Sequence, residues 1–250
     1  MPHIYYEESG IVIIHGDSRD ALPILRGDAI VTDPPYNVRT DDIELEGRSP
    51  MKRDFGVWDT DWKVAPFLEE AAPVVAPGGT LLAFTSDRLL AGWRGNELLW
   101  RPRGTLVWEK TNPAPHPRPA YVSATEWIVW LQREGAPAVW NGTGYTLNIL
   151  RYPVCAGGER FDHPTQKPLA LMMELIARHT VVGSMVIDPF MGTGTTLVAA
   201  KRLGRKAVGI ELDERYCEMA VSRLAQATFA FDVKDVLPVD NRPLTQPSLF

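Results

Sequence analysis

The sequence contains little cysteine and no long apolar run. Its two cysteines, Cys155 and Cys217, are too few for a disulfide framework and lack the spacing of a metal site. No apolar run approaches the ~20 residues needed to cross a bilayer. The N-terminus has neither the basic start nor the apolar stretch of a signal peptide. We therefore expect a cytoplasmic protein with no membrane partner, no bound metal and no disulfide.

A surplus of positive charge is also missing. The net charge is −5, whereas nucleic-acid-binding domains usually present a basic footprint. The charge is unevenly distributed, however, because six Lys or Arg residues and only two acids lie between Arg88 and Arg118. That stretch is a candidate phosphate-facing surface. A second basic run, residues 201–206, is interpreted instead as a solvated helix end.

Length and periodicity predict one large α/β domain. The chain has 250 residues, of which 45% are hydrophobic, and short apolar runs alternate with helical patterns. This predicts a seven-stranded, mostly parallel sheet with helices on both faces. The expected strands are 11–15, 29–32, 80–85, 105–109, 126–131, 185–188 and 207–211. The expected helices are 64–75, 88–98, 168–180, 195–203 and 214–225.

Three less regular segments interrupt or follow this pattern. The domain is expected to span residues 1–230, with a polar loop insertion at 37–62 and a short irregular segment at 131–163. Residues 231–250 are expected to form an extended tail. Met172 and Met173 lie on the apolar side of a predicted helix and are expected to belong to the core.

The most informative motif is Asp33-Pro34-Pro35-Tyr36, directly after the predicted strand 29–32. The prolines donate no backbone N–H and fix φ near about −65°, so the strand ends in a rigid turn. The Asp carboxylate and a carbonyl of the turn can each accept one N–H of an exocyclic amine, and the Tyr ring can stack on the base. The motif predicts a site for methylating a nucleobase nitrogen. The alternative is a Pro-Pro turn with a tyrosine that only packs.

A second motif, residues 185–196, indicates a strand, a glycine-rich turn and a helix. Gly192 and Gly194 let the backbone approach a ligand closely, and Thr195 can cap the helix. The third glycine of a dinucleotide-binding fingerprint is missing, which disfavours an NAD site. The next predicted strand ends at Glu211, where an acid can accept both ribose hydroxyls of a nucleoside cofactor. The alternative is a surface acid beside the following helix.

With both motifs in this order, the chain resembles the β class of S-adenosylmethionine-dependent DNA amino-methyltransferases. In that class the catalytic tetrapeptide precedes the cofactor loop. Further matching blocks, in the family's order, are Gly16-Asp17-Ser18 and residues 106–110, 126–129 and 163–168. The resemblance runs from about Ile11 to Ala225 and implies a circularly permuted, Rossmann-like methyltransferase fold. Cofactor and base would meet at the carboxyl ends of neighbouring strands.

The resemblance also assigns residues to the site. The catalytic residues would be Asp33, Pro34, Pro35 and Tyr36. Residues lining S-adenosylmethionine would be Asp17 at the adenine, Glu211 at the ribose, Asp188, Phe190, Gly192 and Gly194 along the methionine part, and Asp33, Lys167 and Thr195 near its reactive end and carboxylate. The alternative for Lys167 is a surface lysine at a helix N-terminus, where its charge would oppose the helix dipole.

The implied reaction is direct methyl transfer to the exocyclic amine of a base flipped out of double-stranded DNA, as in restriction–modification systems. Asp at the first motif position favours adenine N6, since Ser is frequent there in cytosine-N4 enzymes. The alternatives are a cytosine-N4 enzyme, an amino-methyltransferase of RNA or protein glutamine, and a catalytically inactive protein that binds DNA or the sliding clamp. The family often forms homodimers, so a homodimer is a further expectation.

Contacts to DNA and to a second partner are the least constrained expectations. The candidate DNA-binding residues are Arg39, Lys52, Arg53, Arg118, Tyr145, Asn148 and Arg151. Trp140 and Asn141 are further candidates. All of the candidates in the segment 131–163, which are Trp140, Asn141, Tyr145, Asn148 and Arg151, could equally pack the loop. The chain closes on Gln246-Pro247-Ser248-Leu249-Phe250, which looks like the peptide that docks bacterial replication proteins on the sliding clamp. Gln246, Leu249 and Phe250 would bind there, and the alternative is an extended end with incidental apolar residues.

Overall fold

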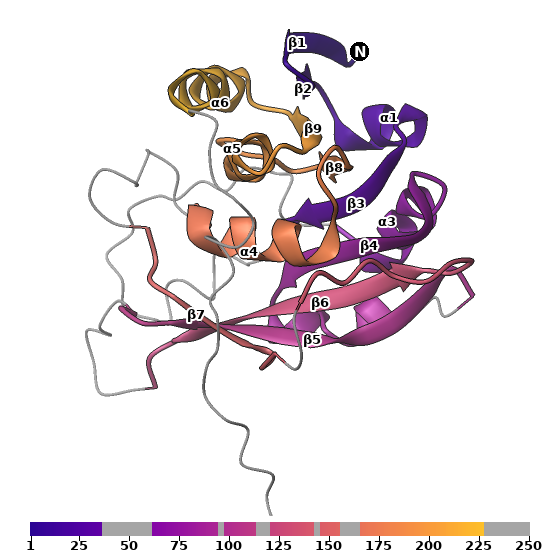
Figure 1. The fold of residues 1–250 in the computed structure, drawn as a ribbon, viewed down its shortest axis with the longest axis vertical. Coiled ribbons are helices and arrows are strands. Elements are labelled where there is room, and N and C mark those ends of the chain that lie inside the picture. The colour runs from indigo at the N-terminus through magenta and orange to yellow at the C-terminus, as the bar shows by residue number, and fades with distance from the viewer. Residues whose placement is uncertain (37–61, 95–97, 114–120, 143–145, 156–165, 228–250) are drawn as a thin grey trace, which may run out of the picture.

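The computed structural model describes residues 1–36, 62–94, 98–113, 121–142, 146–155 and 166–227 (Figure 1). Nine strands form one sheet in the order β1-β2-β9-β8-β3-β4-β6-β5-β7. The strands are β1 (His3–Glu8), β2 (Ile11–His15), β3 (Gly27–Thr32), β4 (Val75–Thr85), β5 (Trp100–Lys110), β6 (Thr125–Arg133), β7 (Ile149–Tyr152), β8 (Met185–Asp188) and β9 (Lys206–Glu211). The helices are α1 (Ser18–Ala21), α3 (Val64–Ala71), α4 (Leu169–His179), α5 (Thr195–Arg202) and α6 (Glu214–Gln226).

The sheet is mixed rather than simply parallel. The pairs β2–β9, β9–β8, β8–β3, β3–β4 and β5–β7 are parallel, whereas β1–β2, β4–β6 and β6–β5 are antiparallel. The five central strands β2, β9, β8, β3 and β4 therefore all end at one edge of the sheet. Because β6 runs the other way and β5 runs back again, the start of β6 and the end of β5 reach this same edge.

The predicted count of seven strands is wrong. All seven predicted strands are present, and β1 and β7 add one at each border of the sheet. No residue of β1 is buried, so its sequence shows no alternation of buried apolar and exposed polar residues. β7 has only four residues, of which Leu150 alone is buried. Edge strands of this kind pair through the backbone and need little apolar sequence.

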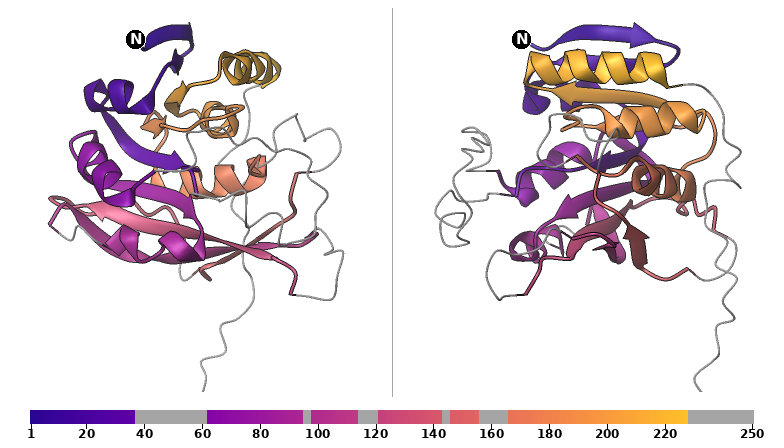
Figure 2. Two further views of the ribbon diagram at one scale, coloured as in Figure 1. Left: turned by 180° about the vertical axis from the view of Figure 1, so that it is seen from behind. Right: turned by 90° about the vertical axis from the view of Figure 1, so that its left-hand side faces the viewer.

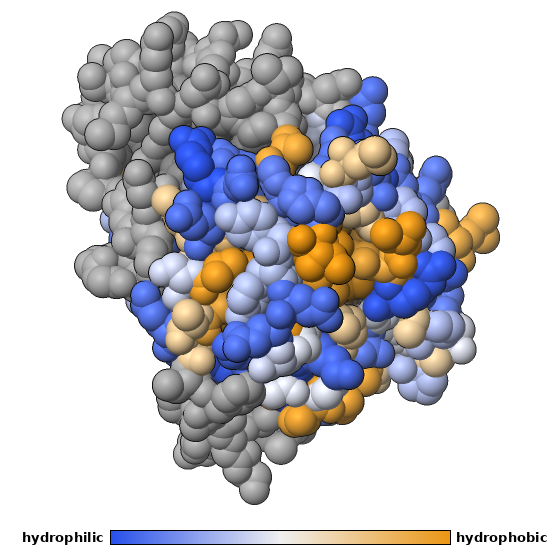
Figure 3. All heavy atoms as spheres, turned by 90° about the horizontal axis from the view of Figure 1, so that it is seen from above, coloured by the Kyte–Doolittle hydropathy of each residue, from blue (hydrophilic) through white to orange (hydrophobic). Residues whose placement is uncertain are grey.

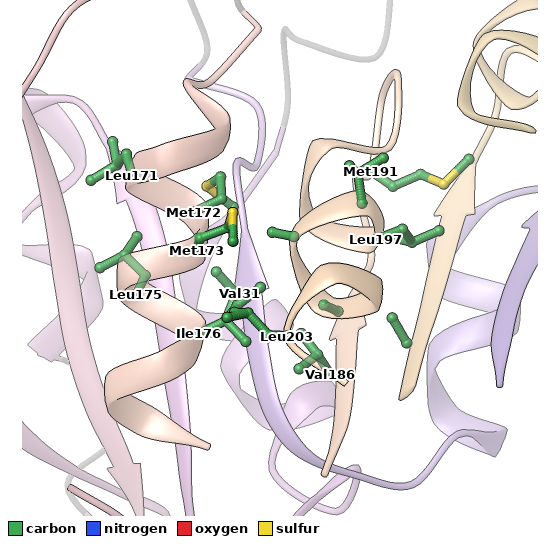
Figure 4. Packing of buried hydrophobic residues seen from close by; sticks show 14 of the residues in the cluster. Val31, Leu171, Met172, Met173, Leu175, Ile176, Val186, Met191, Leu197 and Leu203 are labelled. Carbon is green, nitrogen blue, oxygen red and sulfur yellow. The ribbon is translucent and has the colours of Figure 1, made fainter. Parts of the chain in front are cut away.

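Helices cover both faces of the sheet, as predicted. In Figure 1, α4, α5 and α6 lie on one side of β3, β8 and β9, and α1 and α3 lie on the other; Figure 2 shows the same layers from behind and from the side. Each face has its own buried cluster. In Figure 4, Ile176 of α4 and Leu203 meet beside Val31 and Val186 of the sheet. Met172 and Met173 belong to this cluster, which confirms that they are core residues.

The predicted helix over residues 88–98 is wrong in its described part. Two 3₁₀ turns replace it, Asp87–Leu89 and Gly92–Arg94. Gly92 is a poor helix residue. Trp93, which is 1% exposed, donates from Nε1 to Thr85 Oγ1 at 2.9 Å. Burial of this ring fixes the local backbone more strongly than the helical apolar spacing. The neighbouring predicted helix, 64–75, ends early at Ala71, and Val75 already begins β4.

The basic run 201–206 is not a fully solvated helix end. Arg205 is buried and donates to the carbonyl oxygens of Leu203 and Thr180 and to Thr180 Oγ1. It therefore ties the end of α5 to the end of α4.

The surface is mixed in character. Seen from the β1 and α6 side, hydrophilic and apolar side chains are interspersed (Figure 3). In the described residues no helix has the length and apolar character to span a membrane.

Candidate active site

The Asp33-Pro34-Pro35-Tyr36 turn and the glycine loop meet at one edge of the sheet. Asp33 directly follows β3, Asp188 ends β8 and Glu211 ends β9. Since β3, β8 and β9 are adjacent and parallel, their carboxyl ends lie side by side. Asp17 follows the end of β2, the next parallel strand. The sheet therefore assembles four acids that are up to 194 positions apart along the chain, from Asp17 to Glu211.

The Asp33-Pro34-Pro35-Tyr36 turn is held from within. Pro34 and Pro35 are buried, and Asp33 and Tyr36 are half-buried. Tyr36 Oη donates to Asp33 Oδ1 at 2.6 Å, so the ring is fixed over its own motif. Tyr36 therefore does more than pack, because its hydroxyl is hydrogen-bonded to the carboxylate that follows β3.

A lysine joins the Asp33 carboxylate to a second acid. Lys167 Nζ lies 2.5 Å from Asp33 Oδ2 and 3.2 Å from Glu126 Oε2. Lys110 Nζ lies 2.9 Å from Glu126 Oε1. The Lys167 ammonium also faces the Phe84 ring at 4.9 Å and is only 6% exposed. The surface-lysine alternative for Lys167 is therefore wrong.

Burial and these pairs set the protonation of the network. Burial raises the pKa of Asp33, and Glu126 adds to this, although Lys167 opposes it. Burial also works to raise the pKa of Glu126, but Lys167 and Lys110 outweigh it, and the pKa of Glu126 lies below its usual value. Burial opposes the charge on Lys167, yet the two carboxylates raise its pKa. Burial, Asp33 and Glu126 raise the pKa of Tyr36 well above its usual value, which keeps the hydroxyl protonated.

Asp188 occupies a different environment. It is 3% exposed and accepts from Thr32 Oγ1 at 2.7 Å, Thr196 Oγ1 at 2.5 Å and the Phe190 backbone N–H at 3.1 Å. Burial raises the pKa of Asp188 to about 6, although these hydrogen bonds oppose the rise. The side chain thus ties β3, the glycine loop and α5 together.

The glycine loop has a left-handed backbone where the sequence provides glycine. Gly192 has φ of 51° and Gly194 has φ of 76°. A Cβ atom on Gly194 would lie 2.8 Å from Ala220 Cβ of α6, so glycine also permits close helix packing. Gly194 itself is the N-cap of α5, with no side-chain hydrogen bond. The prediction that Thr195 caps the helix is wrong because Thr195 already lies inside its first turn.

The Thr195 side chain has a partner that the sequence did not suggest. Arg223 of α6 donates to Thr195 Oγ1 at 3.0 Å and to the Thr193 carbonyl oxygen at 2.7 Å. Arg223 is 6% exposed. It therefore links α6 to the loop that begins α5. No local sequence pattern marks this residue, because its partners lie about 30 positions away.

Glu211 and Asp17 define the far end of the site. Glu211 accepts from the Gly192 N–H at 3.0 Å and the Asp213 N–H at 2.8 Å, and each oxygen retains a lone pair. Burial raises the pKa of Glu211, although these N–H groups oppose the rise. The Gly16 N–H donates to the Glu211 carbonyl oxygen at 2.9 Å. Asp17, one residue on, caps α1 and pairs with Arg19 at 2.5 Å.

Phe190, in the glycine loop, lies beside two other aromatic side chains. Its ring centroid lies 5.9 Å from that of Phe67 and 6.3 Å from that of Trp62. The side chain is half-buried against the cluster that includes α3. Phe190 is therefore an apolar wall beside the Asp188 turn.

The segment 131–163 is partly described, and most of its described candidates engage the protein itself. Trp140 stacks on Trp130 at 5.6 Å between centroids, and Asn141 Nδ2 donates to the Ala177 and Thr180 carbonyl oxygens. Trp140 and Asn141 therefore pack the loop, as the alternative interpretation predicted. Asn148 Nδ2 donates to the Thr105 carbonyl oxygen at 3.0 Å, and Arg151 Nε lies 3.1 Å from Glu109 in an exposed ion pair. Predicted residues outside the described part are Arg39, Lys52, Arg53, Arg118, Tyr145, Gln246, Leu249 and Phe250.

Sequence reasoning missed several residues of this site. They are Thr32, Lys110, Glu126, Thr196 and Arg223. Lys110 and Glu126 fall inside blocks that resemble the methyltransferase family. That position in a block was the available indication, but it assigned them no partner.

Comparisons with known proteins agree with this geometry. A family model described as DNA methylase matches residues 27–222. The type II methyltransferase M2.DpnII of Streptococcus pneumoniae is 30% identical over 90% of this chain and 93% of its own length. The crystal structure of an M1.HpyAVI–SAM complex matches with a TM-score of 0.68 and 31% identity, covering 85% of this chain and 98% of that one.

The chain therefore belongs to the DNA methylase family, whose members are DNA amino-methyltransferases. The PvuII DNA methyltransferase, described as cytosine-N4-specific, matches with a TM-score of 0.69 over 92% of this chain and 91% of that one. Its 16% identity shows a shared fold and nothing about the base.

Proposed function

We propose that this protein is an S-adenosylmethionine-dependent DNA methyltransferase that acts on adenine N6. The observation that carries the proposal is the placement of the Asp33 carboxylate beside the glycine loop. Thr32 ends β3 immediately before Asp33 and donates to Asp188 at the start of that loop. The amine acceptor and the cofactor loop are therefore joined by one buried hydrogen bond.

The residues present fit the cofactor. Gly192 and Gly194 leave room for close backbone approach, and Glu211 retains lone pairs for ribose hydroxyls. Asp17 follows Gly16, which is bonded to Glu211, so an adenine contact at Asp17 would adjoin a ribose contact at Glu211. Phe190 would line the methionine part, and Thr195 and Lys167 would lie nearest its carboxylate. Asp188 serves mainly to hold the loop.

S-adenosylmethionine supplies, when bound, an electrophilic methyl group on a sulfonium sulfur. The target base would leave the duplex stack, which costs a few kcal/mol, and stack on Tyr36. Asp33 and the Pro34 carbonyl would accept its two amine N–H groups. The nitrogen lone pair then forms the N–C bond while the S–C bond breaks and its electrons stay on sulfur. The methylated amine would then release one proton to water, and no covalent bond to the protein would form.

Orientation supplies much of the rate acceleration in such a displacement. Asp33 acts as an acceptor that stabilises the positive charge developing on the amine. The identity of the base rests on Asp33, because the resemblance associates Asp at this position with adenine. A cytosine-N4 enzyme is the second candidate, because the matched family includes both N6-adenine and N4-cytosine methyltransferases.

Partners beyond the cofactor complete the proposal. Double-stranded DNA is the substrate. The proposed DNA-contacting residues are Asn148 and Arg151, together with five residues outside the described part: Arg39, Lys52, Arg53, Arg118 and Tyr145. A homodimer and attachment to a bacterial sliding clamp through Gln246, Leu249 and Phe250 are further proposals. Deleting Leu249 and Phe250 should abolish retention of the protein on the immobilised clamp. Equal retention of both forms, or none of the full-length chain, would contradict the clamp proposal.

Methyl incorporation from labelled S-adenosylmethionine tests the main proposal. The purified protein is offered double-stranded DNA, RNA and protein in parallel, and the products are hydrolysed and analysed as nucleosides and amino acids. We expect label in DNA alone, as N6-methyladenine. If N4-methylcytosine were the only product, the target base would be cytosine rather than adenine. Label in RNA or protein, or no label together with cofactor binding by calorimetry, would favour the corresponding alternatives.

A further inference from the structure

The ammonium group of Lys167 is shared by two carboxylates, of which one belongs to the catalytic turn. Lys167 precedes α4, Asp33 follows β3 and Glu126 lies near the start of β6. Its Nζ is 2.5 Å from Asp33 and 3.2 Å from Glu126. Lys110 occupies the other oxygen of Glu126, so Glu126 Oε2 is the oxygen turned to Lys167.

This sharing bears on what Asp33 must do. In the structure, one oxygen of Asp33 accepts from Tyr36 and the other faces Lys167. A base amine that approaches Asp33 Oδ2 would share that oxygen with the Lys167 ammonium, and the positive charge developing on the amine would be repelled by that ammonium. A carboxylate fully neutralised by a lysine also stabilises a developing positive charge less well than a free one. The lysine therefore needs another anion close by, and Glu126 supplies it.

We propose that Glu126 is a positioning residue for methyl transfer: it draws the Lys167 ammonium away from Asp33 Oδ2 when the target amine takes that place. The proposal rests on the proposed function, in which Asp33 accepts the amine. Glu126 acts through Lys167 and needs no contact with the base. Lys110 keeps Glu126 anchored while Lys167 shifts toward it.

The charges of the network support this assignment. The pKa of Glu126 is lowered, because its two lysines outweigh the effect of burial, whereas burial and Glu126 raise the pKa of Asp33. Glu126 therefore holds its negative charge more firmly than a free glutamate does, and Asp33 holds its charge less firmly than a free aspartate does. The charged and titratable described groups around Asp33 are Tyr36, Lys110, Glu126, Lys167 and Asp188.

The variant Glu126→Gln tests the proposal, because it keeps the shape and removes the charge. With Lys167 then paired to Asp33 alone, we expect kcat to fall by about tenfold or more, while calorimetry shows S-adenosylmethionine affinity within a few-fold of wild type. The acidic limb of the pH profile of kcat should also move to lower pH. The reason is that loss of Glu126 removes a charge that raises the pKa of Asp33. A structural defect would lower the rate at all pH values without this shift.

A double-mutant cycle with Lys167→Met isolates the coupling. Once Lys167 is gone, Glu126 has no lysine to draw away from Asp33, so adding Glu126→Gln should cost much less than it does in wild type. Equal costs in both backgrounds would contradict the proposal. Glu126→Asp keeps the charge at a slightly greater distance and should fall between wild type and Glu126→Gln, which keeps the test decisive should the Gln variant fold poorly.

Glu134→Gln is the matched control. Glu134 lies just beyond the opposite end of β6, in an exposed pair with Arg101 at 3.8 Å, and kcat should be unchanged. If wild type methylates DNA and Glu126→Gln keeps its kcat within about twofold and an unshifted pH profile, the role of Glu126 is overturned and the proposed function stands. If wild type methylates no DNA, or Asp33→Ala is equally active, the proposed function itself fails.

Discussion

Asp33 and Asp188 end adjacent parallel strands, yet their surroundings differ in kind. Asp33 is half-buried and bonds to a lysine and a tyrosine hydroxyl. Asp188 is almost fully buried and bonds to two threonine hydroxyls and one backbone N–H. One carboxylate is held by a shared charge, and the other by neutral donors.

The difference suits the proposed roles, in which Asp33 accepts the amine and Asp188 holds the glycine loop at the cofactor. The Lys167 ammonium lies within reach of both Asp33 and Glu126, so it can stay paired when one carboxylate takes another partner, and this is what an acceptor for an incoming amine requires. Buried neutral hydrogen bonds are costly to leave unmade, so Asp188 is suited to holding the glycine loop in place. Thr32 connects the two, since it bonds to Asp188 and precedes Asp33.

Removal of Asp33 should have the largest effect and should act on rate alone. Asp33→Ala deletes the amine acceptor, and we expect methyl transfer to fall by about a thousandfold or more. Cofactor affinity should stay within a few-fold, and the free energy of unfolding should change little because Lys167 retains Glu126. Single-turnover assays, calorimetry and urea unfolding would measure the three quantities. Strong retained activity would remove Asp33 from the mechanism.

Removal of Asp188 should show the opposite pattern. Asp188→Ala leaves the hydroxyls of Thr32 and Thr196 buried without their acceptor, and should lower the free energy of unfolding by about 2–4 kcal/mol. Cofactor binding should weaken together with stability, because the loop loses its anchor. Urea unfolding and calorimetry on the same samples would test this. A stable variant that lost activity alone would mean that Asp188 resembles Asp33 after all.

A smaller effect should come from the glycine loop itself. Gly194→Ala places a methyl group at φ of 76° and 2.8 Å from Ala220 Cβ. The conformational part of the cost is about 1–2 kcal/mol. Gly183→Ala is the control, because Gly183 has φ of 85° but no atom within 4 Å of the added Cβ. Thermal unfolding should show a larger loss for Gly194→Ala, and cofactor affinity should fall in that variant alone. Equal behaviour would show that close packing against α6 does not matter.

The sequence predicted the local structure around Asp33 and Asp188, because that structure depends on the order of residues along the chain. The strand before Asp33 and the strand–glycine–helix unit at Asp188 follow from apolar runs that end in special residues. Their adjacency follows from parallel strand packing. The strand count was too low because the edge strands β1 and β7 bury almost no side chains. The helix predicted from Arg88 gave way to the burial of Trp93.

The ionic part of the site was beyond sequence reasoning. Glu126 lies 41 positions before Lys167 and 93 after Asp33, and no spacing rule relates three residues from different elements. Their approach depends on the antiparallel placement of β6 beside β4, which brings the start of β6 to the carboxyl ends of the parallel strands. Arg223 is a similar case, since a buried arginine on an amphipathic helix has the pattern of an exposed one.

Sequencing of DNA with base-modification detection, from a host that expresses the protein, tests the central claim most directly. Wild type should place N6-methyladenine at a defined short sequence, and Asp33→Ala should leave the same sites unmodified. Unmodified DNA from a host with folded wild-type protein would contradict the account, and so would equal modification by both proteins.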